Sequence, residues 1–290
     1  MPGGPDPALL AAYTECRRVH RRHDPTYYLA TRRLPSQVRP AVHALYAFVR
    51  TADELVDGPG RPADPAARSA ALDRCQGELE RALSGEPSSD PTVTALVDAG
   101  SRHGLPLGEL GAYFDSMRVD CSPVRMESWE ELERYMLGSA GTVGRILASL
   151  LDAPPERHEA FVRLALAFQL TNFIRDVRED WQLDRVYLPR EDRDRFGVTV
   201  EQIARREVTP GFREMLALEV GRARELFRDG EEASQGLPSD VRRGMRMARA
   251  VYLGVLDRAE RLGFDVLRRR ASLPPWELAG AVAGGLRHGA

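Results

Sequence analysis

The sequence predicts an all-α fold, a single domain over residues 1–290 with roughly ten helices. Apolar residues recur three and four positions apart along most of the chain, which is the spacing of one helix face. No segment alternates apolar and polar residues as a half-buried strand does. Short stretches with Pro or Gly separate the helical segments, and such short connections are typical of helix bundles.

The boundaries of the helices follow from capping residues and chain breaks, taken in order. A first amphipathic helix covers 7–23, and Ser36 is the expected N-cap of a second that ends before Gly58. Ser128 is the expected cap of a long helix from Trp129 to about Asp152. The segment 183–189 is expected to be a lid or loop. The other expected helices cover 65–83, 92–103, 107–117, 156–181, 200–206, 212–234 and 239–262, with a last short apolar helix after Pro275.

Three glycines, at 138, 141 and 144, fall inside the long helix that begins at Trp129. Each is expected to lower helix stability by roughly 1 kcal/mol relative to alanine. Such a repeated cost predicts close approach to the helix backbone, either by a neighbouring helix or by a bound substrate. The sequence leaves both readings open.

Two helical segments carry paired aspartates in otherwise apolar surroundings. In 165–180, one helix face is polar and consists of Gln169, Asn172, Asp176 and Asp180. In 42–57, the corresponding face consists of Tyr46, Arg50, Asp53 and Asp57. A single Asp-x-x-x-Asp pair is usually a solvated helix face, whereas a helix that is apolar on most sides is usually buried. Because both pairs lie on helices of the second kind, we expect them to point into the interior.

If these two helices face each other, four carboxylates meet in one cavity. Like charges repel strongly in a poorly solvated site, so a cation is needed between them. Oxygen ligands suit Mg²⁺, which completes its shell with water and substrate phosphates. Because the acids repel one another, replacing Asp53 or Asp176 by alanine is expected to abolish turnover and to spare the fold.

Composition excludes several classes of function. The formal net charge of −2 gives no reason to expect a nucleic-acid partner, and the absence of lysine excludes a Schiff base or a Walker-type phosphate site. Three separated cysteines without a Cys-x-x-Cys motif favour a cytoplasmic protein. No secretory signal and no run of ~18 apolar residues is found. Peripheral contact with a membrane surface is the one membrane association left open.

Several segments, the two acidic ones among them, resemble the squalene/phytoene synthase family of head-to-head prenyl synthases, and most of all bacterial phytoene synthases of the actinobacterial type. The matching segments are 27–35 (YYLATRRLP), 44–57 (ALYAFVRTADELVD), 116–120 (SMRVD), 135–144 (YMLGSAGTVG), 168–180 (FQLTNFIRDVRED), 185–189 (RVYLP) and 252–269. They extend over nearly the whole chain.

The resemblance implies an isoprenoid-synthase helical fold whose cavity is lined by the two acid-bearing helices. Mg²⁺, or Mn²⁺ as a substitute, would bridge the protein to a prenyl diphosphate, and no nicotinamide or flavin is expected. The implied metal ligands are Asp53, Asp57, Asn172, Asp176 and Asp180, and the four aspartates with Tyr46 and Tyr252 form the implied catalytic set. The implied substrate-binding residues are Thr26, Tyr28, Arg50, Tyr135, Gln169, Asn172, Arg175, Arg185 and Arg269.

The leading functional hypothesis is condensation of two geranylgeranyl diphosphates into phytoene, through a cyclopropyl diphosphate, for carotenoid biosynthesis. The chain departs from the family pattern at Asp184, where Gly is usual, in the 138–141 stretch, at Arg145 (expected to point outward), and in its short length. These departures leave two alternatives open: transfer of one prenyl group to a small aromatic acceptor, or a squalene or presqualene type synthase that uses farnesyl diphosphate. A helical scaffold that binds prenyl diphosphate without turnover is the non-enzyme alternative.

Overall fold

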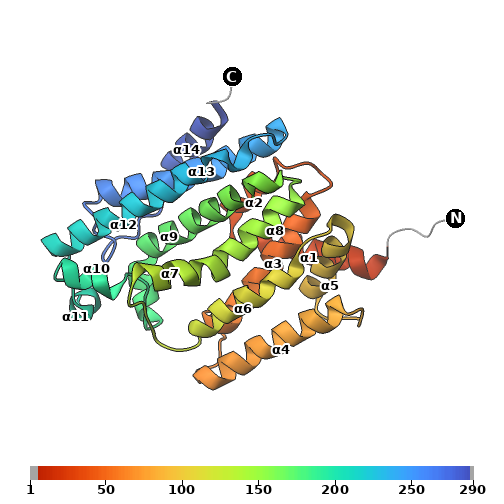
Figure 1. Ribbon diagram of the computed structural model, residues 1–290, viewed down its shortest axis with the longest axis horizontal. Helices are drawn as coiled ribbons and strands as arrows, with labels where there is room; N and C mark the ends of the chain where they lie inside the picture. The colour runs from red at the N-terminus through yellow and green to blue at the C-terminus, as the bar shows by residue number, and fades with distance from the viewer. Residues whose placement is uncertain (1–5, 288–290) are drawn as a thin grey trace.

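The computed structural model describes residues 6–287, apart from the side chains of Thr26, Leu286 and Arg287, and is almost entirely helical (Figure 1). The α-helices are α1 (Pro7–His23), α2 (Pro25–Thr31), α3 (Arg39–Val56), α4 (Pro65–Leu83), α5 (Pro91–His103), α6 (Leu110–Val119), α7 (Trp129–Met136), α8 (Thr142–Leu150), α9 (His158–Gln182), α10 (Arg190–Arg195), α11 (Val200–Ala204), α12 (Pro210–Asp229), α13 (Ser239–Arg261) and α14 (Pro275–Arg287). The shorter elements are η1 (Leu107–Glu109), η2 (Leu137–Gly141), η3 (Pro155–Arg157), η4 (Glu231–Ser234), β1 (Val124–Arg125) and β2 (Arg185–Val186). The predicted all-α fold is confirmed.

Four helices begin with the same two-residue signal, an aspartate followed by proline. Asp6, Asp24, Asp64 and Asp90 each accept a hydrogen bond from a backbone N–H in the first turn of α1, α2, α4 and α5. The proline that follows lies in the first turn, where a backbone N–H would have no acceptor within the helix, and its ring fixes φ near the helical value. This pair fixes the start of each helix locally, before any tertiary packing.

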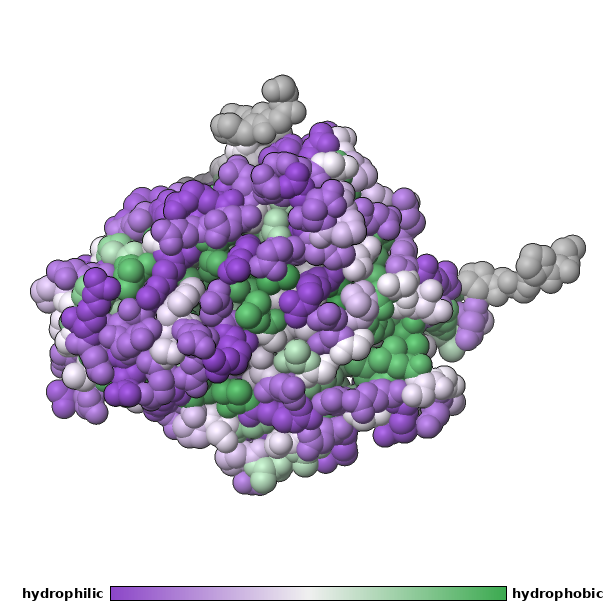
Figure 2. Space-filling model, viewed as in Figure 1, coloured by the Kyte–Doolittle hydropathy of each residue, from purple (hydrophilic) through white to green (hydrophobic). Residues whose placement is uncertain are grey.

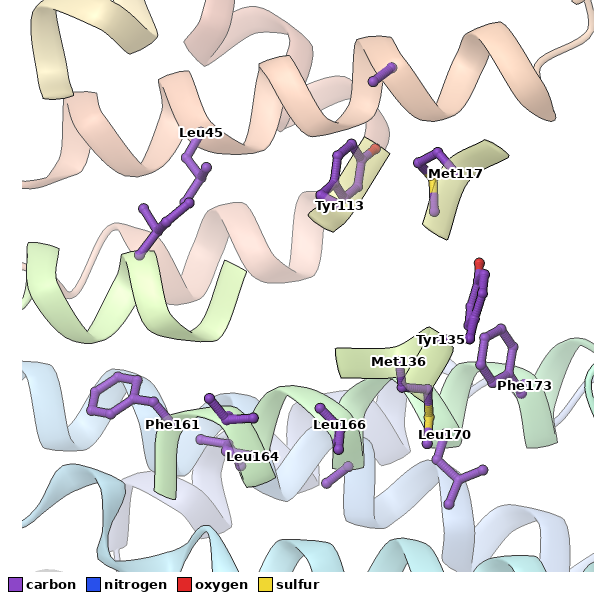
Figure 3. Close-up of a cluster of buried hydrophobic side chains, with 14 of the residues drawn as sticks. Leu45, Tyr113, Met117, Tyr135, Met136, Phe161, Leu164, Leu166, Leu170 and Phe173 are labelled. Carbon is purple, nitrogen blue, oxygen red and sulfur yellow. The ribbon is translucent and has the colours of Figure 1, made fainter. Parts of the chain in front are cut away.

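The bundle is organised around α9, which packs against α8, α12 and α13, while α3 packs against α1, α4 and α5 (Figure 1). Apolar side chains follow one another along α9 and are drawn in Figure 3: Phe161, Leu164, Leu166, Leu170 and Phe173. Those of α3, such as Leu45 and Phe48, belong to the same core. The two acid-bearing helices are therefore buried elements, as the sequence indicates.

The long helix that begins at Trp129 contains a π turn, η2, between α7 and α8. A Cβ added at Gly138 would clash with the Ser116 hydroxyl and lie 2.6 Å from the Ala112 carbonyl oxygen, so α6 packs directly on this turn. At Gly144 a Cβ would lie 2.9 Å from the Phe161 carbonyl oxygen of α9. Close helix packing therefore explains both glycines, and Gly144 also lines a cavity.

One local expectation is wrong and another holds only in part. Ser36 does not cap α3, because residues 36–38 still form a turn and the helix starts only at Arg39, after Val38 and without a side-chain cap. The segment 183–189, expected to be a lid or loop, is a loop apart from the two residues of β2. It is not an open lid, because β2 pairs in parallel with β1 and its neighbour Tyr187 is only 4% exposed.

Hydrophilic side chains cover most of the face shown in Figure 2, with smaller hydrophobic areas between them. Within residues 6–287, no helix combines the length and the hydrophobicity needed to cross a bilayer.

Candidate active site

The four predicted aspartates meet in one pocket with a cavity volume of about 280 Å³. Helix α3 contributes Asp53, and Asp57 follows at its end, while α9 contributes Asp176 and Asp180. Three arginines line the same pocket: Arg50, Arg175 and Arg185. The structure thus brings together acidic and basic side chains that lie more than a hundred residues apart in the sequence.

On the α3 side, the Tyr113 hydroxyl donates to Asp53 Oδ1 at 2.6 Å. In Figure 3 the Tyr113 side chain points its hydroxyl toward α3. Burial raises the pKa of Asp53 to about 7, although this hydrogen bond lowers it. Burial also raises the pKa of Asp57, against the opposing effect of Arg50. Both carboxylates therefore lack sufficient positive charge around them.

On the α9 side, Asp176 differs from the other three acids. Arg175 contacts both of its carboxylate oxygens, Nε at 2.9 Å and Nη2 at 2.5 Å, and Arg270 Nε reaches Oδ1 at 2.7 Å. Burial alone would raise the pKa of Asp176, but the two guanidinium groups outweigh it and the pKa is lowered. At Asp180, burial and the charge of Asp176 hold the pKa well above its usual range.

The backbone of α9 leaves helical geometry at Asp176, with φ −107° and ψ 16°. This kink lies where the apolar part of α9 ends and its charged part enters the pocket. Local departures from α-helical geometry often occur at functional sites. The expectation that an alanine at position 176 spares the fold is weakened, because Arg175 would lose its charged partner.

A fifth carboxylate, Asp120, was not among the predicted site residues. It is 6% exposed, and its two oxygens accept from the hydroxyls of Tyr135 at 2.6 Å and Tyr187 at 2.7 Å. Arg185 donates to the Asp120 carbonyl oxygen at 3.0 Å. Asp120 thus holds three groups that line the pocket. The sequence signal that could have identified Asp120 as a site residue was its place in the matching segment 116–120.

An apolar chamber of about 370 Å³ adjoins the acidic pocket, and both are lined by Asp53, Met117, Gln169 and Asn172. Of the residues implied to be catalytic or substrate-binding, Tyr46, Gln169 and Tyr252 line this chamber. Tyr135 instead lines the acidic pocket, and Figure 3 shows its hydroxyl pointing toward Met117. The Tyr252 ring packs against Phe168 with centroids 4.4 Å apart.

Some predicted phosphate contacts lie elsewhere. Tyr28 lines neither cavity; its ring stacks on His43 and its hydroxyl accepts from Arg17 Nε at 3.0 Å. Because α2 is a helix, consecutive side chains point in different directions, so Tyr27 and not Tyr28 lines the chamber. The side chain of Thr26 lies outside the described residues.

Arg269 is exposed, and its neighbour Arg270 reaches Asp176. A turn with a positive φ of 60° at Phe264 precedes this segment. Arg145 pairs with Glu109 at 2.6 Å and lines neither cavity, as expected for an outward-pointing residue.

Comparison with known proteins identifies the family. The family model for squalene/phytoene synthase matches residues 20–277. Phytoene synthase of Thermus thermophilus is 37% identical, over 90% of this chain and 88% of its own length. The 15-cis-phytoene synthase of Synechococcus elongatus is 33% identical, over 95% of this chain and 94% of its own. The chain belongs to the squalene/phytoene synthase family. It is a prenyltransferase.

Solved structures of this family share the fold. Squalene synthase HpnC from Alicyclobacillus acidocaldarius superposes with a TM-score of 0.80 at 31% identity, covering 88% of this chain and 95% of its own. A dehydrosqualene synthase in complex with a ligand gives a TM-score of 0.86 and covers 96% of both chains. At 24% identity, this second likeness bears on the fold alone.

The residues of the acidic pocket fit a divalent cation. Within residues 6–287, no three His, Cys, Asp or Glu side chains form a complete metal cluster by themselves. Mg²⁺ does not require one, since it is commonly held by one or two carboxylates and by phosphate oxygens. Asn172 Oδ1 is buried in the pocket wall with no hydrogen-bond partner among the described residues. An orphaned acceptor beside carboxylates of raised pKa matches the donor set that Mg²⁺ uses.

Proposed function

We propose that the chain joins two geranylgeranyl diphosphates head to head into phytoene, with Mg²⁺ as cofactor. The observation that carries the proposal is the junction of two unlike cavities, a charged pocket and an apolar chamber, at Asp53, Gln169 and Asn172. A prenyl diphosphate has the same division between a polyanionic head and an apolar tail. The relatives described above as phytoene synthases support this substrate over farnesyl diphosphate.

The charged pocket would hold the diphosphates. Asp53, Asp57, Asn172, Asp176 and Asp180 would hold Mg²⁺, which stabilises the charge that develops on a departing diphosphate. The arginines that line the pocket bind diphosphate oxygens without any proton transfer. These residues are Arg50, Arg175 and Arg185. Asp120 acts indirectly, because it holds Tyr135, Tyr187 and Arg185 in place.

The apolar chamber would hold the tails and the cations formed from them. The rings of Tyr46 and Tyr252 line it and stabilise positive charge by cation–π attraction. Its other walls come from side chains such as Val143, Leu147 and Phe161, which exclude water from a reactive cation. Together these walls favour rearrangement over quenching by water.

The reaction then proceeds through two ionisations. Breaking one C–O bond releases the first diphosphate and leaves an allyl cation, which the double bond of the second substrate attacks. Loss of a proton closes a cyclopropane that still carries the second diphosphate. The second ionisation releases that group, and in the absence of a reductant the rearranged cation ends by losing a proton.

The test is an incubation of purified protein with geranylgeranyl diphosphate and Mg²⁺, without a reductant. We expect a C40 hydrocarbon and two diphosphates released for each, and loss of both on addition of EDTA or in Asp180→Asn. Unchanged substrate would refute the proposal. So would a C30 product formed faster from farnesyl diphosphate, or a single prenyl group attached to an added aromatic acceptor.

A further inference from the structure

Two arginines hold Asp176 by both of its carboxylate oxygens. Arg175 donates to Oδ1 through Nε and to Oδ2 through Nη2, and Arg270 Nε donates to Oδ1 as well. Neither arginine forms an ion pair with any other acid within residues 6–287. Bonds between a guanidinium group and a carboxylate are among the strong hydrogen bonds of proteins. Two positive charges therefore stand where a cation has to approach Asp176.

The contact between Arg175 and Asp176 depends on the kink in α9. Consecutive side chains of a regular helix do not face each other. These two nevertheless form a bidentate contact at the point where the backbone of Asp176 has φ −107° and ψ 16°. A return of Asp176 to helical geometry would separate the two side chains. The arginine-held carboxylate thus has an alternative position close by.

Arg270 reaches Asp176 from the segment 262–274, which connects α13 to α14. Leu267 and Ala271, on either side of Arg270, are both 0% exposed and fix the backbone of this segment in the core. The Arg270 side chain, in contrast, is 46% exposed. It can therefore leave Asp176 by rotation of its own bonds, without movement of the chain.

The other acids of the pocket are not held in this way. The side chain of Asp53 accepts from the neutral hydroxyl of Tyr113. Within the described part of the chain, no arginine lies at ion-pair distance from the carboxylate of Asp53, Asp57 or Asp180. The pocket therefore offers a cation two unequal pairs of acids. The pair on α3 is open to a cation, and the pair on α9 is blocked at Asp176.

We propose that Arg175 and Arg270 keep a cation off Asp176 until a diphosphate enters the pocket and takes both guanidinium groups. Phosphate oxygens accept the same bidentate hydrogen bonds as a carboxylate. Asp176 is then released as a cation ligand, and the cation and the polyanion arrive together. By linkage, each tightens the binding of the other. This inference deepens the proposed function, on which it rests for the roles of Mg²⁺ and diphosphate.

Mn²⁺ binding in an Asp53→Asn background tests the block directly. This background disables the pair on α3, so the acids of α9 are left, and the electron paramagnetic resonance signal of free Mn²⁺ reports the bound fraction. Adding Arg270→Gln should tighten Mn²⁺ binding by about ten-fold. Arg269→Gln removes the same charge from the next position, which is exposed and pairs with no acid in the described chain, and should change the affinity little. No gain from Arg270→Gln, or equal gains from both variants, would overturn the proposal.

Calorimetry with inorganic pyrophosphate in EDTA tests the release of the arginines. Asp176→Asn frees both of them, so this variant should bind pyrophosphate about ten-fold more tightly than wild type does. In an Arg270→Gln background the same change should gain only about three-fold, because Arg175 alone is left to be released. Equal gains in the two backgrounds would trace the effect to the loss of one negative charge and overturn the proposal.

The proposed function is tested separately, by turnover of geranylgeranyl diphosphate in the wild type. Turnover together with failure of both binding tests refutes the exchange of partners alone. The expected binding results without turnover refute the proposed function alone.

Discussion

The buried pair His20 and His43 predicts a measurable dependence of stability on pH. Their Nδ1 atoms lie 2.9 Å apart, the side chains are 0% and 6% exposed, and His20 stacks on the Tyr46 ring with centroids 4.0 Å apart. Burial, reinforced by His43, lowers the pKa of His20 to about 3. Burial, reinforced by Arg17 and Arg39, lowers the pKa of His43 to about 4. Both imidazoles are therefore neutral in the folded protein.

The magnitude follows from linkage. In the unfolded chain a histidine titrates near 6.5, so below that pH the unfolded state binds more protons than the folded state. The free energy of unfolding therefore falls as the pH is lowered. Between pH 7.5 and 5.5 each neutral histidine removes about 1.4 kcal/mol, and the pair removes about 2.8 kcal/mol. For a chain of this length that is a drop in Tm of about 5 °C. The loss continues until the pH passes the lowered pKa values of the folded state.

Urea unfolding at pH 7.5, 6.5 and 5.5 measures this effect. His20→Phe keeps a ring against Tyr46 but removes one titrating group, so the loss between pH 7.5 and 5.5 should shrink by about 1.4 kcal/mol. Carboxylates of raised pKa such as Asp53 act in the opposite direction, but they are common to all variants and cancel in the comparison. His103→Gln, at the end of α5, is the control. An unchanged pH dependence in His20→Phe would refute the assignment of a neutral buried pair.

Two further predictions concern the site and its support. Gly138→Ala should lower the free energy of unfolding by about 1–3 kcal/mol, because the new methyl group meets Ser116 and the Ala112 carbonyl oxygen. Gly141→Ala, whose added Cβ has its nearest neighbour at 3.4 Å, should change the free energy of unfolding by less than about 1 kcal/mol. Urea unfolding of both variants compares them directly. Asp176→Asn should lower the Tm because Arg175 and Arg270 lose their charged partner, whereas Asp53→Asn should leave the Tm of metal-free protein unchanged or raised, although both abolish turnover. Equal changes in Tm would show that the two acids have the same structural role.

The sequence predicted the parts of the site that depend on helix periodicity. Residues three or four apart share a face whatever the tertiary structure, so Asp53 with Asp57, and Asn172 with Asp176, could be grouped before any coordinates were known. The same holds for helix starts, since Ser128 accepts from the Glu131 N–H at 3.2 Å as its spacing predicts. Local chemistry decides these features, and local chemistry can be read from the chain.

What the sequence did not predict depends on contacts between distant segments. The β1–β2 pair joins Val124 to Arg185 through two residues on each side, which is too short a run to leave a pattern. This contact holds the segment expected to be a lid or loop against the rest of the fold. Asp120 becomes a support for the pocket only because Tyr135 and Tyr187 converge on it from different elements. The four aspartates are equivalent in the sequence, yet Asp176 alone among them is contacted by two guanidinium groups within the described residues. Spacing along one helix fixes which side chains share a face, but the charge that each of them meets is set by what packs opposite.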